Sequence, residues 1–181
     1  MKYCGFVSIL LVFMTGCIGT RILNKSDKKF LGNKLGITYL NKQHPVIDTI
    51  FPSLNNIYYN EIGDIFTHNG FLITLTDDSL KFENPSIEEI RRICNAMNLD
   101  GLIISYICFS HVKKYIYFIP TSQYFDNIFE SKLFDKEGSL ILKVQHNTKY
   151  DVYESVPDND IIIKTSIQKT VEKLLNELNG K

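Results

Sequence analysis

The chain has 181 residues, of which 20 are basic and 20 acidic, so its formal net charge at pH 7 is zero. This balance removes the electrostatic argument for nucleic-acid binding, which depends largely on neutralising phosphates, and no nucleic-acid partner is predicted. With 44% hydrophobic and 12% aromatic residues, the composition excludes a disordered spacer and fits one packed globular domain.

The N-terminus has the features of a secretory signal. Lys2 is followed by an apolar stretch over about residues 6–14, and residues 15–17 then read Thr-Gly-Cys. A positive start, a short apolar centre and small residues at a cleavage site define such a signal. As a helix, residues 4–14 would reach only about 16 Å, whereas the hydrocarbon core of a bilayer is about 30 Å thick. A transmembrane helix is therefore not predicted here.

The sequence Met14-Thr15-Gly16-Cys17 resembles the lipobox of bacterial lipoproteins, with methionine in place of the usual leucine. In that family the cysteine thiol receives a diacylglyceryl group, the signal is cut just before it, and the new amine is usually acylated, for example with palmitate. Each buried methylene contributes about 0.8 kcal/mol, so two or more chains give stable membrane anchoring. The resemblance implies a signal peptide over residues 1–16 and lipidation of Cys17. The alternative is an ordinary secretory signal with an incidental cysteine.

Two expectations about location and domain organisation follow. Ile18, and not aspartate, comes after the cysteine, which resembles the pattern of lipoproteins sent to the outer membrane. The protein is therefore expected to be lipid-anchored in the cell envelope, at the outer membrane and facing the periplasm. Residues 18–33 are polar and basic with little periodicity, so residues 17–33 are predicted to be a lipidated tether and residues 34–181 a single α/β domain.

Two cysteines remain after the signal is removed and Cys17 is lipidated, namely Cys94 and Cys108. We expect Cys94 on a helix and Cys108 on the following strand, with a reversal near Gly101. Seven residues of helix and seven of strand differ in length by about 13 Å. This offset exceeds the roughly 7 Å between Cα atoms that a disulfide allows. Two buried free thiols are predicted.

Periodicity and turn chemistry predict the first elements of the domain. Residues 34–40 alternate as a first strand, and residues 71–76 are apolar and β-branched, which predicts a second strand. Residues 54–66 have helical spacing between them, with Ser53 as a candidate N-cap and Asn69-Gly70 as a stop.

The clearest local signal is the sequence SIEEIRRICNAMN, which begins at Ser86. Ser86 and Glu89 have the spacing of a capping box, in which each side chain can bond a free backbone N–H of the other residue. The apolar residues that follow are at helical spacing and predict an amphipathic helix with its stripe in the core. That stripe consists of Ile87, Ile90, Cys94 and Met97.

The second half of the chain predicts a central strand and a meander. Residues 102–109 are apolar on both faces, which is typical of a strand in the middle of its sheet. The HVKK sequence at residues 111–114 is expected to turn the chain into a strand that ends at Pro120. Asp135–Gly138 has the chemistry of a hairpin turn, because Gly138 can adopt a positive φ.

A closing helix completes the predicted fold. It begins at Asp158 or Asp160 and ends at Gly180, with one side formed by Ile163, Ile167, Val171, Leu174, Leu175 and Leu178. The element order is β-α-β-α-β-β-(β)-β-α. Because helical crossovers join parallel strands and hairpins join antiparallel ones, the predicted fold class is α/β, with helices packed on a mixed sheet.

This order resembles the amino-terminal domain of TolB and the lipoproteins related to the curli-secretion protein CsgG and the synthase activator LpoB. The matching positions are Asp100-Gly101 before the central strand and Asp135–Gly138 in the hairpin, within residues 34–179. Domains of this group serve as adaptors, secretion parts or enzyme activators. The resemblance therefore implies a role that needs no catalytic residues.

One polar set is a candidate for chemistry, although the sequence contains no P-loop, GxSxG or HExxH motif. His44, Asp77, Asp78 and His111 follow or end predicted strands. Ligands gather beyond the carboxyl ends of parallel strands in open α/β sheets, and histidine with carboxylate can bind zinc or do acid–base work. The alternative is that these are solvated turn residues. No metal and no cofactor are predicted.

Aromatic pairs are the other notable feature, because aromatic anchors dominate many protein interfaces. Tyr58-Tyr59, Tyr115–Phe118 and Tyr124-Phe125 form either a recognition face or part of the core. Together the sequence predicts a membrane-anchored, non-enzymatic lipoprotein that acts through contacts with other envelope proteins. The alternative is a hydrolase or a ligand-binding lipoprotein that uses the strand-end histidines and aspartates.

Overall fold

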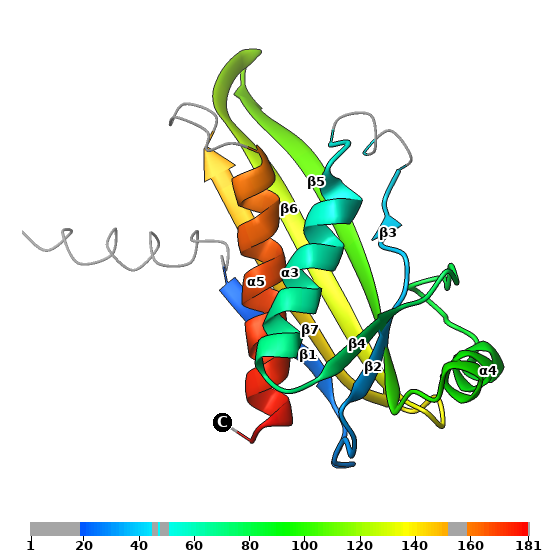
Figure 1. Ribbon diagram of the computed structural model, residues 1–181. Coiled ribbons are helices and arrows are strands. Elements are labelled where there is room, and N and C mark those ends of the chain that lie inside the picture. The colour runs from blue at the N-terminus through cyan, green and yellow to red at the C-terminus, as the bar shows by residue number, and fades with distance from the viewer. Residues whose placement is uncertain (1–18, 45–46, 48–50, 152–158, 181) are drawn as a thin grey trace, which may run out of the picture.

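The computed structural model (Figure 1) describes residues 19–44, 47, 51–151 and 159–180. Within these ranges the chain forms β1 (Gly19–Lys25), β2 (Lys34–Ile37), β3 (Asn41–Lys42), α3 (Leu54–His68), β4 (Leu72–Leu75), α4 (Ile87–Met97), β5 (Gly101–Ile116), β6 (Ile119–Asp135), β7 (Leu140–Asp151) and α5 (Asn159–Leu178). None of the helices in these ranges is both long and apolar enough to cross a bilayer. The signal sequence and Cys17 lie outside the described residues, so their roles stay predictions.

The strands belong to one open, mixed sheet with the order β1-β7-β6-β5-β2-β4, and β3 also pairs with β5. β2 is parallel to β4 and to β5, and β3 is parallel to β5. The second half is a meander in which β5, β6 and β7 are successively antiparallel, and β1 returns antiparallel to β7. The predicted α/β class is confirmed, and the strand with two apolar faces, β5, lies inside the sheet as expected.

α3 and α5 lie side by side on one face of this sheet (Figure 1). Each buries an apolar stripe at helical spacing: Leu54, Tyr58, Ile62 and Phe66 on α3, and Ile163, Ile167, Val171 and Leu174 on α5. The stripes close over strand residues that include Leu35, Ile37, Ile103, Ile107, Phe129 and Leu133. Because strand side chains alternate between faces, these residues form one side of the sheet. The apolar side predicted for the last helix is confirmed.

α4 covers part of the opposite face and forms a smaller core. Its buried residues Ile90, Ile93 and Cys94 pack with Leu80, Phe82, Leu99, Leu102, Ile104 and Phe134. The predicted stripe was wrong at its two ends, since Ile87 is 52% exposed and Met97 is 40% exposed. α4 is short and contacts the sheet only through the middle of the helix. The residues near that contact are buried, and the residues at the two ends of the helix remain in water.

Two of the three ends predicted for α3 and α4 follow the predicted chemistry. The Ser86 hydroxyl accepts a hydrogen bond from the backbone N–H of Glu89 at 3.3 Å, so the cap of α4 is confirmed. α3 ends at Asn69-Gly70 as predicted. Ser53 occupies the predicted N-cap position of α3 but makes no side-chain capping bond, because its backbone is already helical and its hydroxyl donates instead to the Asp160 carboxylate of α5 at 2.9 Å.

The tether interpretation is wrong for Gly19–Lys25, which form the edge strand β1. The strand pairs with β7 from Gly19 opposite Asn147 to Lys25 opposite Leu142. The Arg21 guanidinium donates to the Gln145 side chain at 2.8 and 3.0 Å, which adds a side-chain link across the pair. The rest of the proposed division into signal peptide, tether and one domain stays a prediction.

The predicted turn at residues 111–114 is also wrong, because β5 continues through them to Ile116. The chain reverses at Tyr117 and Phe118, with φ of 46° and 69°. Turns with two positive φ angles usually contain asparagine or glycine, so nothing in these two aromatic residues signals one. The second hairpin is confirmed: β6 ends at Asp135, β7 begins at Leu140, and Gly138 has a φ of 80°.

Both remaining cysteines are free thiols, as predicted. Cys94 is buried, and burial raises its pKa to about 11, so the reactive thiolate is disfavoured. Cys108 is only half-buried, contrary to the prediction, and its thiol donates to the Gln43 side chain at 2.9 Å.

Candidate functional site

The polar residues predicted to form a strand-end site occupy different environments. His44 is exposed just after β3, and Asp77 is exposed just after β4. Asp78 forms an ion pair with Arg92 of α4 at 2.8 Å, so its carboxylate has a structural partner. His111 lies within β5 and not at its end, because the strand continues to Ile116.

The register of the sheet separates Asp77 from His111. Leu75 of β4 pairs with Ile37 of β2, and Ile37 pairs with Ile103 of β5. Asp77 therefore stands about two residues past the level of Ile103, and the remaining six residues of β5 span about 20 Å. No group of three His, Cys, Asp or Glu side chains suited to a metal exists among the described residues. The geometry gives no support to a shared catalytic or metal site.

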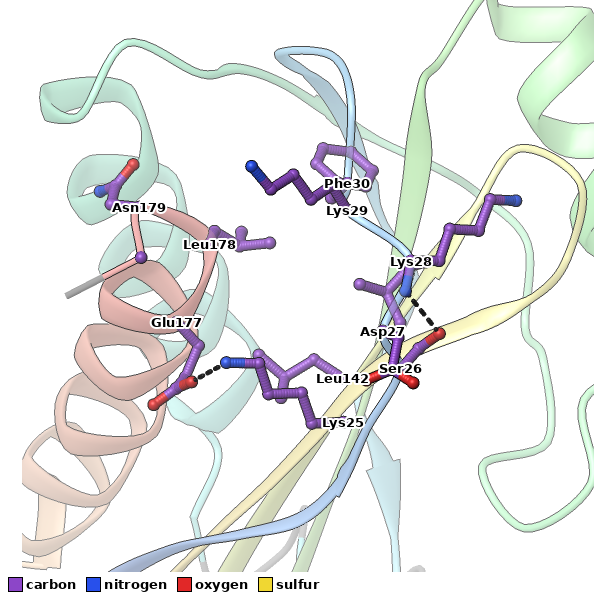
Figure 2. A pocket seen from close by; sticks show the side chains of 12 residues that line it. Lys25, Ser26, Asp27, Lys28, Lys29, Phe30, Leu142, Glu177, Leu178 and Asn179 are labelled. Carbon is purple, nitrogen blue, oxygen red and sulfur yellow. Dashed lines mark hydrogen bonds and ion pairs between the residues drawn. The ribbon is translucent and has the colours of Figure 1, made fainter.

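A pocket of about 530 Å³ lies between the β1–β2 connection and the C-terminal end of α5 (Figure 2). Its lining includes Lys25, Lys28, Lys29, Phe30, Leu142 and Glu177. Lys25 binds Glu177 at 2.6 Å across the pocket. The side chains of Lys173 and Lys25 hold the pKa of Glu177 below its ordinary value.

The other ion pairs near the pocket also join separate elements. The pocket is therefore better explained as a contact region that ties these elements together than as a reactive site. Lys28 binds Asp135 at the end of β6 and lies 3.7 Å from Glu137. These ion pairs fasten the β1–β2 connection to the β6–β7 hairpin. Sequence analysis missed the pocket because residues 18–33 were interpreted as a tether.

The most exposed aromatic residues of the described chain are at the turn between β5 and β6. Tyr117 is 90% exposed and Phe118 is 97% exposed; we call this pair the tip. Figure 1 shows the hairpin projecting beyond the ends of α3 and α5. Of the other predicted aromatic pairs, Tyr58 is fully buried and Tyr59 packs against the core, so for these two the core interpretation holds.

The strand directions relate the start of β1 to the tip, although Gly19 is level with Cys108 near the middle of β5. β1 runs antiparallel to β7, β7 antiparallel to β6, and β6 antiparallel to β5. Following β1 backward from Lys25 to Gly19 therefore leads in the same direction as following β5 forward to the tip. Cys17 directly precedes this strand in the sequence, separated from Gly19 only by Ile18.

These features define a class: a single mixed α/β sheet with two helices on one face, a small helix on the other, and no metal cluster among the described residues. No protein-family model and no curated protein sequence matches the chain. The solved structures do include similar folds.

A PelC dodecamer from Paraburkholderia phytofirmans is similar with a TM-score of 0.53 and 11% identity, over 86% of this chain and 96% of PelC. The lipoprotein GNA1162 from Neisseria meningitidis has a TM-score of 0.47 and 7% identity, over 83% and 100% of the two chains. The rare lipoprotein B from Shewanella oneidensis has a TM-score of 0.39 and 7% identity, over 80% and 94%. At these identities the likeness concerns the fold alone.

Proposed function

We propose that the protein is a lipoprotein of the cell envelope, anchored through acylated Cys17, whose folded body acts through contacts with other envelope proteins. The observation that carries the proposal is the lipobox-like sequence Met14–Cys17 placed directly before β1. An anchor in this position would hold the sheet close to the bilayer at its β1 edge.

The proposed role is non-catalytic, and the edge strand β4 supplies a surface for it. The backbone N–H of Leu72 donates to the Asn33 carbonyl, and the backbone N–H of Thr76 donates to the Ile37 carbonyl of β2. The N–H groups of these two residues therefore point toward β2. Because backbone N–H groups alternate along a strand, those of Ile73 and Leu75 point away from β2. An open strand edge of this kind accepts an extended segment of a partner protein.

Exposed leucines strengthen this assignment. Leu72 is 59% exposed and Leu75 is 52% exposed, and such apolar side chains beside an open edge favour a protein partner. PelC, which has a similar fold, was solved as a dodecamer, so a second copy of this chain is among the partners to test.

Replacement of Cys17 by serine tests the anchor. In intact cells the wild-type chain should carry acyl mass on Cys17, incorporate labelled palmitate and sediment with the outer membrane in a density gradient, because acyl chains give stable anchoring. The Cys17→Ser chain should lose the label and leave the membrane fraction. Cys108→Ser, which removes a half-buried thiol, is the matched control and should behave as wild type. A wild-type product that begins at Met1, or that carries no acyl mass, would refute the proposal.

A further inference from the structure

We propose that the tip, Tyr117 and Phe118, contacts the interfacial zone of the same bilayer that holds acylated Cys17, so that the protein is attached at two points. This inference rests on the proposed function. The first observation is exposure, because both aromatic side chains are almost entirely in water, at 90% and 97%. Two adjacent exposed aromatic side chains at the end of a projection are unfavourable in water and need a surface to cover them.

The tip stands on a ribbon that extends beyond the rest of the sheet. The last rung between β6 and β7 joins Tyr124 to Asp151. Past that rung, among the described residues, β5 and β6 pair only with each other, from Lys113 opposite Gln123 to Ile116 opposite Ile119. A two-stranded ribbon is marginally stable on its own in water, so burial of its end in another medium would stabilise it.

The composition of this ribbon end suits a lipid surface. Lys113 and Lys114 precede six consecutive apolar or aromatic residues, Tyr115 to Pro120. Aromatic residues concentrate at the boundary between the hydrocarbon and the headgroups, and lysines favour anionic lipid headgroups.

The sheet register places the tip on the side of the molecule from which the anchor leaves. Gly19 pairs with Asn147, which pairs with Ile128, which pairs with Cys108 of β5. From the level of Cys108 the tip lies about nine residues, or about 30 Å, farther along the strand. β1 and β5 are separated by three strand spacings, about 14 Å. A flat surface can therefore touch both the start of β1 and the tip if the strands meet it obliquely.

The short connection to the anchor makes a second contact effective. The two residue steps from Cys17 to Gly19 span at most about 7 Å, and β1 is hydrogen-bonded into the sheet. The tip would thus be confined near the bilayer, where even a weak affinity is amplified by a high effective concentration.

The chain contains no tryptophan, so a single introduced tryptophan reports on the tip alone. The test uses the full acylated protein in vesicles of phosphatidylethanolamine and phosphatidylglycerol. Phe118→Trp should show blue-shifted emission and quenching by brominated lipids, because its indole enters the interface. Leu31→Trp is the matched control: Leu31 is 81% exposed and belongs to the β1–β2 connection, at the other end of β1. Its emission should stay unshifted and unquenched. Equal melting temperatures for the two variants confirm that both are folded.

The outcomes separate this inference from the proposed function. If both variants float with the vesicles but Phe118→Trp remains unshifted, the anchor is real and the second contact is wrong. If neither the variants nor the wild type floats or carries acyl mass, the proposed function itself fails. A blue shift that appears without vesicles and grows with protein concentration would mean that the tip docks on a second copy of the chain, and this too overturns the membrane contact.

Discussion

Tyr58 is a fully buried residue of α3 whose hydroxyl has no hydrogen-bond partner among the described residues. Ser105 lies near it, but the Ser105 hydroxyl is bonded to that of Ser131 at 2.7 Å. Burial raises the pKa of the Tyr58 hydroxyl well above its ordinary value. An unpaired buried hydroxyl is unfavourable, so its removal should not weaken the core.

We therefore expect Tyr58→Phe to keep the free energy of unfolding within about 0.5 kcal/mol of wild type or to raise it. Phe66→Ala, which empties a comparable fully buried site on the same helix, should cost about 3–5 kcal/mol. Urea unfolding followed by circular dichroism measures both. A loss above about 1.5 kcal/mol for Tyr58→Phe would mean that the hydroxyl has a partner in solution.

Asp135 links the β6–β7 hairpin to the β1–β2 connection. Burial opposes its ionisation, but the Lys28 ammonium and the backbone N–H of Ser139, at 2.8 Å, outweigh burial and hold the pKa of this carboxyl below its ordinary value. A carboxyl with a depressed folded-state pKa stabilises the protein above its unfolded-state pKa. That stabilisation is lost as the pH falls through the folded-state pKa.

Asp135→Asn should accordingly lower the free energy of unfolding by about 1–2 kcal/mol at pH 7. The difference from wild type should shrink as the pH falls below about 4, the ordinary value for aspartate. Urea titrations at a series of pH values measure this difference. Lys28→Met removes one partner only and should reproduce part of the loss. A difference that is the same at pH 7 and at pH 2 would contradict the assignment.

At the scale of elements, the β6–β7 turn and α4 are packed against each other. Gly138 has a φ of 80°, and a Cβ placed there would lie 2.6 Å from the Ile87 side chain and 3.2 Å from its carbonyl oxygen. Gly138→Ala should therefore cost about 1–3 kcal/mol of unfolding free energy, from backbone strain and the clash.

Gly63→Ala is the matched control, because none of the described atoms lies within 4 Å of the added Cβ in the middle of α3. That change should stabilise the protein by about 0.5–1 kcal/mol. Thermal melts that rank the two variants in the opposite order would refute this account.

Elements whose signals are local could be predicted from the sequence. The cap at Ser86, the turn at Gly138 and the apolar stripe of α5 are each specified by residues within one or two turns of chain. β1 could not be found in this way, since its pairing partners, such as Asn147 for Gly19, lie more than a hundred residues away. Apart from Leu23, its exposed side chains are polar, as suits an edge strand, and therefore resemble a linker.

The predicted position of His111 at a strand end was wrong for a related reason. The prediction assumed that each parallel strand ended where its apolar run ended, and this placed His111 at a strand end. β5 instead continues to Ile116, because pairing with β6 carries the strand through Lys113 and Lys114, whose own sequence gives little strand signal. The tip became visible only when the position of the turn was known, since neither Tyr117 nor Phe118 is a common turn residue.

At the scale of the whole molecule, the sheet is open and its two edges differ. β1 forms one edge and lies next to the proposed anchor, Cys17, in sequence, whereas β4 forms the other and exposes Leu72 and Leu75. The lipid and the proposed protein partner would thus use opposite edges of one sheet. This arrangement leaves the partner edge accessible while the protein is held at the bilayer.

Proline scanning of β4 tests the proposed partner edge. In Leu75→Pro the lost N–H points away from β2, so pairing with β2 should survive and the free energy of unfolding should fall by no more than about 1 kcal/mol. The ring would nevertheless block an incoming strand, and crosslinking in intact cells should lose its protein partners. Thr74→Pro is the control, because alternation turns its N–H toward β2 and its loss should destabilise the fold itself. If Leu75→Pro retains every crosslinked partner of the wild type while remaining folded and membrane-bound, the β4 edge is not the contact surface and the partner must bind another face of the sheet.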